Sequence, residues 1–238
     1  MESNVFTQHF RRGGVIPTTA DGGEWLGVRT GTLTAANLAF SGGEVVMTMT
    51  NTSEVQNICF HQGDVLGFDP NEIDWVEFDV RVPVTPGANS KFAIGLASAR
   101  NADFDAITHS VFFSLAANSN VWRCECDDNV TDTAAVSTGI AALAGSQSQT
   151  LAMHFVEQPN TIAPPGRPQG RFSNINFYIS TNNALRRVAS TTLFNAAAIA
   201  TSGQKLQLFS QISKTSSTDV GTVAIREIRY RYRNLTGS

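Results

Sequence analysis

The feature that most constrains the fold of this chain is an alternation of apolar and polar residues with a period of two. The clearest run lies between Trp75 and Val84, where valines and Phe78 alternate with charged residues and prolines mark the end. Similar runs recur along the chain, separated by turn-rich segments such as Asp69–Asn71. Such alternation is typical of β-strands with one buried face. The sequence therefore predicts about ten to twelve short strands in an all-β protein.

The composition indicates one folded domain. Hydrophobic residues make up 42% of the 238 residues and charged residues 16%, whereas soluble domains usually hold about 25% charged residues. This composition excludes a disordered chain and a coiled coil. A net charge of −3 argues against a dedicated nucleic-acid-binding protein. Because no linker divides the chain, we expect a single sandwich or barrel domain at residues 25–238, preceded by an irregular N-terminal arm at residues 1–24.

The cysteines and the N-terminal segment favour a protein made in a cytoplasm. Cys59, Cys124 and Cys126 are too few and too dispersed for a disulfide framework or a four-ligand metal site. We expect buried free thiols, with no metal and no cofactor. Met1–Gly14 lacks the apolar stretch of a signal peptide, and no apolar run has the ~20 residues that span a bilayer. We therefore expect no membrane partner.

Much of the chain resembles a pattern found in bacteriophage virion proteins. The matching segments are Gly63–Leu66, Ile73–Val82, Phe92–Ala99, Asp105–Phe113, Asp127–Asn129, Thr138–Gly139, Ile175–Ile179 and Leu206–Lys214. They are similar to the concanavalin A-like (laminin G-like) jelly-roll domain that decorates phage capsids, and the resemblance covers residues 40–233. It implies an antiparallel two-sheet jelly-roll sandwich that decorates or cements a capsid, without enzymatic activity. It also implies the major capsid protein as partner and a place on the capsid surface, after assembly in the host cytoplasm.

One motif points to a different function. Glu72–Glu77 matches the E-I-D-x-x-E signature of laminarinase-type endoglucanases, which share the concanavalin A-like fold. The match would make Glu72 the nucleophile, Asp74 its helper and Glu77 the acid/base residue. However, Glu72 follows a turn sequence, and Glu77 shares its predicted outward face with Arg81. The tryptophans that could line a sugar cleft are also scattered in the sequence, at Trp25, Trp75 and Trp122.

We therefore predict no catalytic residues. A lectin-like carbohydrate-binding module on the particle surface is the second hypothesis for the function, because lectins use the same sandwich. A laminarinase-type hydrolase is the third.

An acidic segment at Asp127, Asp128 and Asp132 offers the oxygen ligands that Ca²⁺ prefers. The same residues, with Asn129, are also common in hairpin turns. The turn is the favoured interpretation, and calcium binding remains the alternative.

The last strand alternates arginine with apolar residues, and only three of the 17 basic residues of the chain are lysines. An Arg–Tyr row of this kind can be a solvated strand face or a docking surface, and stacking on nucleic acid is disfavoured by the net charge. The N-terminal arm and a proline-rich stretch at residues 157–171 could also reach neighbouring subunits, for which we expect a homotrimer. The candidate interface residues are Phe6, Phe10, Arg11, Arg12, Pro164, Pro165, Arg167, Arg226, Arg229, Tyr230, Arg231, Tyr232 and Arg233.

Overall fold

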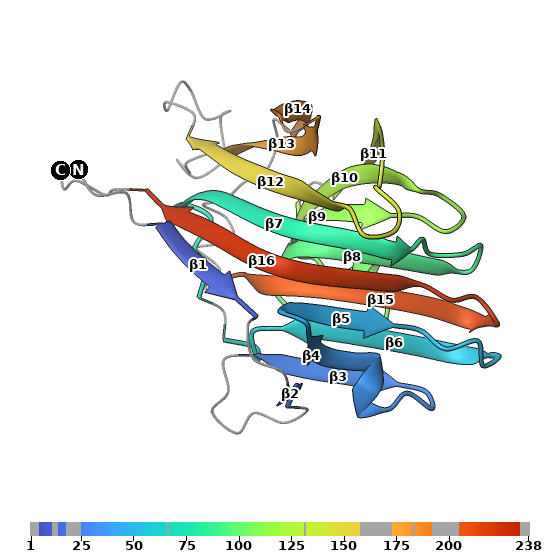
Figure 1. Cartoon of the computed structure of the whole chain (residues 1–238). Helices are drawn as coiled ribbons and strands as arrows, with labels where there is room; N and C mark the ends of the chain where they lie inside the picture. The colour runs from blue at the N-terminus through green and yellow to red at the C-terminus, as the bar shows by residue number, and fades with distance from the viewer. Residues whose placement is uncertain are drawn as a thin grey trace.

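The period-two segments form the strands of two antiparallel sheets that stack as two layers (Figure 1). The computed structural model describes residues 5–10, 14–17, 25–65, 67–130, 132–157, 173–182, 184–191 and 205–233. The arm residues Arg11 and Arg12 and the loop residues Pro164, Pro165 and Arg167 lie outside the described residues. Sixteen strands lie within the described residues, more than the ten to twelve that the sequence predicts.

We call the larger sheet, with nine strands among the described residues, sheet A. Its strand order is β14 (Ala184–Thr191), β13 (Ser173–Thr181), β12 (Ser148–Glu157), β7 (Ile73–Val84), β16 (Thr222–Tyr232), β5 (Glu44–Thr48), β4 (Leu38–Ser41) and β2 (Gly14–Val15), with β1 (Val5–His9) beside β16.

We call the other sheet, with seven strands among the described residues, sheet B. Its order is β11 (Asp132–Ala141), β10 (Val121–Asp128), β9 (His109–Leu115), β8 (Ser90–Ala97), β15 (Gln207–Ser217), β6 (Glu54–His61) and β3 (Leu26–Thr30). Two short 3-10 helices, η1 (Ala35–Asn37) and η2 (Phe104–Ala106), complete the described elements. Within the described ranges, no helix is long and apolar enough to span a membrane.

The core lies between the two sheets and follows the predicted alternation. On β7, Val76 and Phe78 are fully buried, whereas Glu77 between them is partly exposed on the other side of the sheet. On β10 the same alternation buries Trp122, Cys124 and Cys126 in the core, a group that the sequence predicts. The two-sheet antiparallel sandwich is therefore confirmed.

Two described parts of the expected N-terminal arm, Val5–His9 and Gly14–Val15, are strands of sheet A. β5 pairs with β16 only from Thr222 to Ile225, so the edge of β16 beyond that point is open. β1 fills this opening and pairs with residues 227–231 of β16. Phe10, expected at an interface, is instead 3% exposed in the core, where its ring contacts Trp25 and Phe60. A side chain buried in this way cannot meet a neighbouring subunit.

The outer face of β8 in sheet B carries small residues because other chain segments lie close against it. At Gly95 the limit comes from the neighbouring strand and the core, because a Cβ atom would lie 2.0 Å from the carbonyl oxygen of Val111 on β9 and 2.9 Å from Cε of Met153, so only glycine fits there. Phe104 and Ile107, from the segment around η2, are buried in a second apolar cluster on this face. That packing holds the loop after β8 against sheet B.

Candidate functional site

The laminarinase-like motif lies at the start of β7, on the outer face of sheet A. Glu72 is exposed in the turn before the strand, and its amide donates to the carbonyl of Asp69 over 2.9 Å. In the pairing with β16, Trp75 faces Arg231 but Ile73 faces Tyr232, so Asp74 occupies a β-bulge. A bulge redirects one side chain relative to the regular alternation. It allows Asp74 to approach the side chains on the outer face.

Both strand carboxylates of the motif form ion pairs. Asp74 accepts a hydrogen bond from Nε of Arg231 over 2.6 Å, and Nε2 of His154 on β12 lies 3.3 Å from its other oxygen. Glu77 lies 3.3 Å from Nε of Arg229 and accepts a hydrogen bond from Nε1 of Trp75 over 2.7 Å. The side chains of Asp74 and Glu77 are 22% and 18% exposed, so both ion pairs remain partly accessible to solvent.

Three rings gather beside these carboxylates. The ring of Trp75 lies 5.2 Å from His154 and 5.2 Å from Tyr178 of β13, measured between centroids. Ala152 of β12 stands between Tyr178 and Glu77 in the strand register and is fully buried. Because its side chain is only a methyl group, the rings from β7 and β13 can meet above β12.

A cavity of about 380 Å³ opens beside this aromatic group. It is lined by Val5, Trp75, Glu77, Arg229, Tyr230 and Arg231. Sequence reasoning treats Trp75 as isolated, whereas the structure brings it together with His154 and Tyr178. The sequence does contain a signal for this group. His154 lies between Met153 and Phe155, and Tyr178 lies between Phe177 and Ile179, so each stands at a position of the polar face in an otherwise apolar strand.

The arginines of β16 are paired with carboxylates of sheet A. Besides the pairs already described, Arg229 lies 2.8 Å from Glu227, and Arg226 lies 3.3 Å from Glu44 of β5. Arg233 donates to the carbonyl of Phe155, among other acceptors. The predicted row of arginines therefore exists, and much of its charge is balanced within the sheet.

The tyrosines of β16 do not share that outer row. Tyr230 and Tyr232 pack against the core, where their ring centroids lie 5.0 Å and 6.1 Å from the ring of buried Phe68. Phe6 of β1, 48% exposed, stacks on Tyr230 at 5.3 Å. Arginine and tyrosine side chains thus alternate between the two faces of the strand, as the solvated-face interpretation expects, and do not form one stacking surface.

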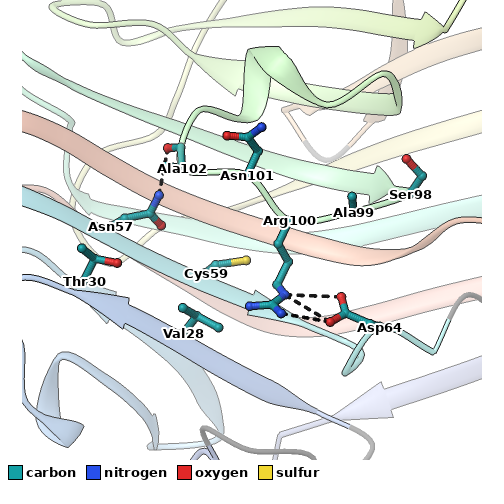
Figure 2. Close-up of a pocket in the computed structure, with 10 residues that line it drawn as sticks. All are labelled: Val28, Thr30, Asn57, Cys59, Asp64, Ser98, Ala99, Arg100, Asn101 and Ala102. Atoms are coloured by element: carbon teal, nitrogen blue, oxygen red, sulfur yellow. Dashed lines mark hydrogen bonds and ion pairs between the residues drawn. The ribbon is translucent and has the colours of Figure 1, made fainter.

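A second cavity, of about 480 Å³, lies on the outer face of sheet B (Figure 2). Val28 and Cys59, adjacent in the register of β3 and β6, line it together with the loop that follows β8. At one end, Asn57 donates from Nδ2 to the carbonyl of Ala102 over 2.9 Å. At the other end, Arg100 forms an ion pair with Asp64, with 3.1 Å between Nη2 and Oδ2 (Figure 2).

Burial sets the direction of the pKa shift for Cys59 and His61 at this second cavity, but not for Asp64. It strongly raises the pKa of the Cys59 thiol, which therefore stays neutral. Burial lowers the pKa of His61, whose Nδ1 atom lies 3.6 Å from Oδ1 of Asp64. For Asp64 itself, burial opposes ionisation, but hydrogen bonds from Gln207 and Arg100 outweigh it and lower the pKa.

The acidic segment at the end of β10 forms a hydrogen-bonded turn. Asp127 accepts from the amide of Asn129 over 2.7 Å, and Asp128 accepts from the amide of Val130 over 2.9 Å. Asn129 has a φ of 62°, a backbone conformation that asparagine tolerates in turns. Within the described ranges, no group of three or more acidic, histidine or cysteine side chains is placed to hold a metal ion. The three cysteines are buried thiols that form no disulfide bond among the described residues.

Neither a protein-family model nor a curated protein sequence matches the chain. Solved structures match its fold. SCLam, a non-specific endo-β-1,3(4)-glucanase from family GH16, has a TM-score of 0.61 at 9% identity, over 98% of this chain and 92% of that chain. The laminarinase from Rhodothermus marinus has a TM-score of 0.60 at 10% identity, over 96% and 97%.

A carbohydrate-binding protein also matches. The carbohydrate recognition domain of Emp46p has a TM-score of 0.55 at 8% identity, over 91% of this chain and 95% of that chain. Identities this low establish the architecture and not the activity, because one fold hosts many functions. The chain has the concanavalin A-like jelly-roll fold.

Proposed function

We propose that the outer face of sheet A binds glycans without cleaving them. The observation that carries this proposal is the group of Trp75, His154 and Tyr178 beside the paired side chains of Glu77 and Arg229. A pyranose ring presents an apolar C–H face and a rim of hydroxyl groups. The aromatic group offers an apolar surface for the C–H face. The carboxylate and guanidinium groups offer hydrogen-bond acceptors and donors for the hydroxyl groups.

The known proteins with this fold support the choice of ligand. Two of the similar structures are a β-glucanase and a laminarinase, and a third is a carbohydrate recognition domain. Binding to glycans is the property that these three descriptions share, whereas cleavage belongs to two of them. These structures therefore support a glycan as the ligand, and the choice between binding and cleavage rests on the carboxylates of the site.

The arrangement of the carboxylates supports binding without hydrolysis. A retaining glycosidase needs one carboxylate free to attack and one that donates a proton, about 5–5.5 Å apart. Here Glu77 is already engaged by Trp75 and Arg229, and Asp74 by Arg231 and His154. Glu72 stands in the turn before the strand.

A glycan array tests this proposal, with the wild-type protein compared with Trp75→Ala and Tyr178→Ala. We expect the wild type to bind a defined set of glycans, and both variants to lose that binding by about tenfold or more. Val136→Ala, at a half-exposed apolar side chain on β11 of sheet B, is the matched control and should bind as the wild type does. Glycan binding that is unchanged in Trp75→Ala would contradict the proposal.

Release of reducing sugar from β-glucans is measured in parallel. We expect none above the level of a heat-denatured sample. Activity of the wild type that disappears in Glu72→Gln would instead support the hydrolase hypothesis.

A second candidate function, decoration of a phage capsid, is favoured by Phe6. This aromatic side chain is 48% exposed on β1, where it stacks on Tyr230. A large exposed apolar side chain of this kind can belong to a contact surface. The partner would be the major capsid protein, with a homotrimer on the capsid surface.

Co-sedimentation with capsids that lack this protein tests decoration. We expect the wild type to bind the capsid and Phe6→Ser to bind more weakly, while sedimentation velocity of the free protein reports its oligomeric state. Failure of the wild type to co-sediment would exclude this function.

A further inference from the structure

The cavity on the outer face of sheet B is unrelated to the glycan site, and we propose that it binds a small hydroxylated carboxylic acid. The site would recognise the carboxylate through Arg100 and the hydroxyl groups through Asn57 and Thr30. It lies on the sheet opposite the aromatic group of Trp75, so this proposal does not depend on the proposed glycan binding.

The loop that forms one wall of the cavity is fixed at several points. The amide of Ser98 donates to the carbonyl of His109 over 2.9 Å. The carbonyl of Ala102 accepts two hydrogen bonds, from Asn57 and from Gln211, over 2.9 and 3.0 Å. Phe104, just beyond, is buried in the second apolar cluster. The cavity is therefore formed before any ligand arrives, which lowers the entropic cost of binding.

Arg100 supplies a charged donor group inside this wall. Figure 2 shows its side chain descending from the loop toward Val28 and Cys59. Asp64 engages its Nε and Nη2 atoms, which leaves Nη1 without a hydrogen-bond partner among the described residues. A guanidinium held on one side by a carboxylate keeps a fixed direction, and its remaining N–H groups suit a second carboxylate.

Asp64 is itself held in place, which sets how Arg100 is presented. Its backbone amide donates to Oε1 of Gln207 over 3.0 Å, and its Oδ1 atom accepts from Nε2 of Gln207 over 3.1 Å. Oδ1 also lies 3.6 Å from Nδ1 of buried His61. Asp64 is therefore a positioning residue for Arg100. The ligand would approach the guanidinium from the side that faces away from Asp64.

The rest of the cavity is neutral. Val28 and the Cys59 thiol form an apolar floor, and burial keeps that thiol protonated. The Nδ2 atom of Asn57 is used by Ala102, so its Oδ1 atom is the one that Figure 2 shows toward the cavity, as an acceptor. Thr30, directly opposite Asn57 in the register, adds a hydroxyl group. A volume of about 480 Å³ accommodates a molecule the size of a sugar acid.

Isothermal titration calorimetry on the full chain tests this site with D-glucuronate as probe. D-glucose lacks the carboxylate, and butyrate lacks the hydroxyl groups. We expect glucuronate to bind, glucose not to bind detectably, and butyrate to bind more weakly than glucuronate. Absence of glucuronate binding, or equal binding of glucose, would overturn the proposal.

Variants locate the binding. Arg100→Gln should weaken glucuronate binding by about tenfold or more, because a charge-assisted contact is lost. Arg187→Gln, at an exposed arginine of β14 in sheet A, is the matched control and should leave it unchanged. Should Arg100→Gln lose cooperative melting, Thr30→Val at the exposed rim provides the same test with an expected loss of a few-fold. Glucuronate binding that is abolished in Trp75→Ala and kept in Arg100→Gln would place it on sheet A and refute the site on sheet B.

Discussion

Trp75 donates a hydrogen bond from Nε1 to Oε1 of Glu77, 2.7 Å away and two residues further along β7. Residues two apart in a strand share a face, so this bond ties an aromatic ring and a carboxylate together on the outer side of sheet A. It fixes the orientation of the indole and occupies one oxygen of Glu77. The same contact thus favours a rigid binding surface and disfavours a carboxylate free for catalysis.

The small size of Ala152 is expected to be required for this surface. In the wild type, the rings of Trp75 and Tyr178 meet above Ala152. In Ala152→Leu, the larger side chain would separate the two rings. We predict a changed near-UV circular dichroism spectrum, loss of glycan binding and a stability loss of about 1–3 kcal/mol from overpacking. Ala134→Leu, on the exposed side of β11, is the control. An unchanged spectrum with unchanged binding would show that the rings do not depend on Ala152.

Glu125 of β10 makes stability depend on pH in an unusual direction. Burial, assisted by the charge of Asp105, raises the pKa of Glu125 to about 7. A carboxyl with a raised pKa in the folded state binds more protons there than in the unfolded state, so stability falls as pH rises from about 4.5 to 7. Glu125→Gln removes this loss of stability at higher pH, because a glutamine amide does not ionise.

We predict that Glu125→Gln is more stable than the wild type by about 2–3 kcal/mol at pH 8, while the two proteins differ little at pH 5. Urea denaturation at both pH values measures the difference, and the pH 5 sample serves as the internal control. A difference of the same size at both pH values would mean that titration of Glu125 is not its cause.

Lys214 of β15 holds two loops together from a buried position. Its ammonium group donates to the carbonyls of Thr50, Thr52, Ser217 and Asp219 over 2.6–3.1 Å, and the residue is 3% exposed. Lys214→Met would keep the length of the side chain and leave these carbonyls without their donor.

For Lys214→Met we predict a loss of about 2–4 kcal/mol in the free energy of unfolding. Chemical denaturation measures it, with Lys205→Met, at an exposed lysine, as the matched control. A loss no larger than that of the control would show that the carbonyls find other partners.

The strands and their buried faces could be predicted from the sequence because that information is local. The alternation around Phe78 predicts which side of β7 is buried, and this prediction does not depend on which strands lie beside β7. The alternation around Cys124 does the same for β10. Both predictions are confirmed by the buried residues of the core.

The grouping of the candidate site could not be predicted, because it depends on strand order. Trp75, His154 and Tyr178 are far apart in the sequence and meet only because β7, β12 and β13 are neighbours in sheet A. The bulge at Asp74 arises from the pairing of β7 with β16, which local periodicity does not encode. For the same reason β1 appears irregular in sequence, since its short run becomes a strand only beside the open edge of β16.

The central claim is that sheet A binds a glycan at Trp75 and leaves it intact. Its most direct test is a calorimetric titration of the strongest array ligand into the wild type and Trp75→Ala, followed by mass spectrometry of the recovered ligand. We predict saturable binding to the wild type, weakened by about tenfold or more in the variant, and a ligand of unchanged mass. Equal affinity of the two proteins, or a shortened ligand, would contradict the claim.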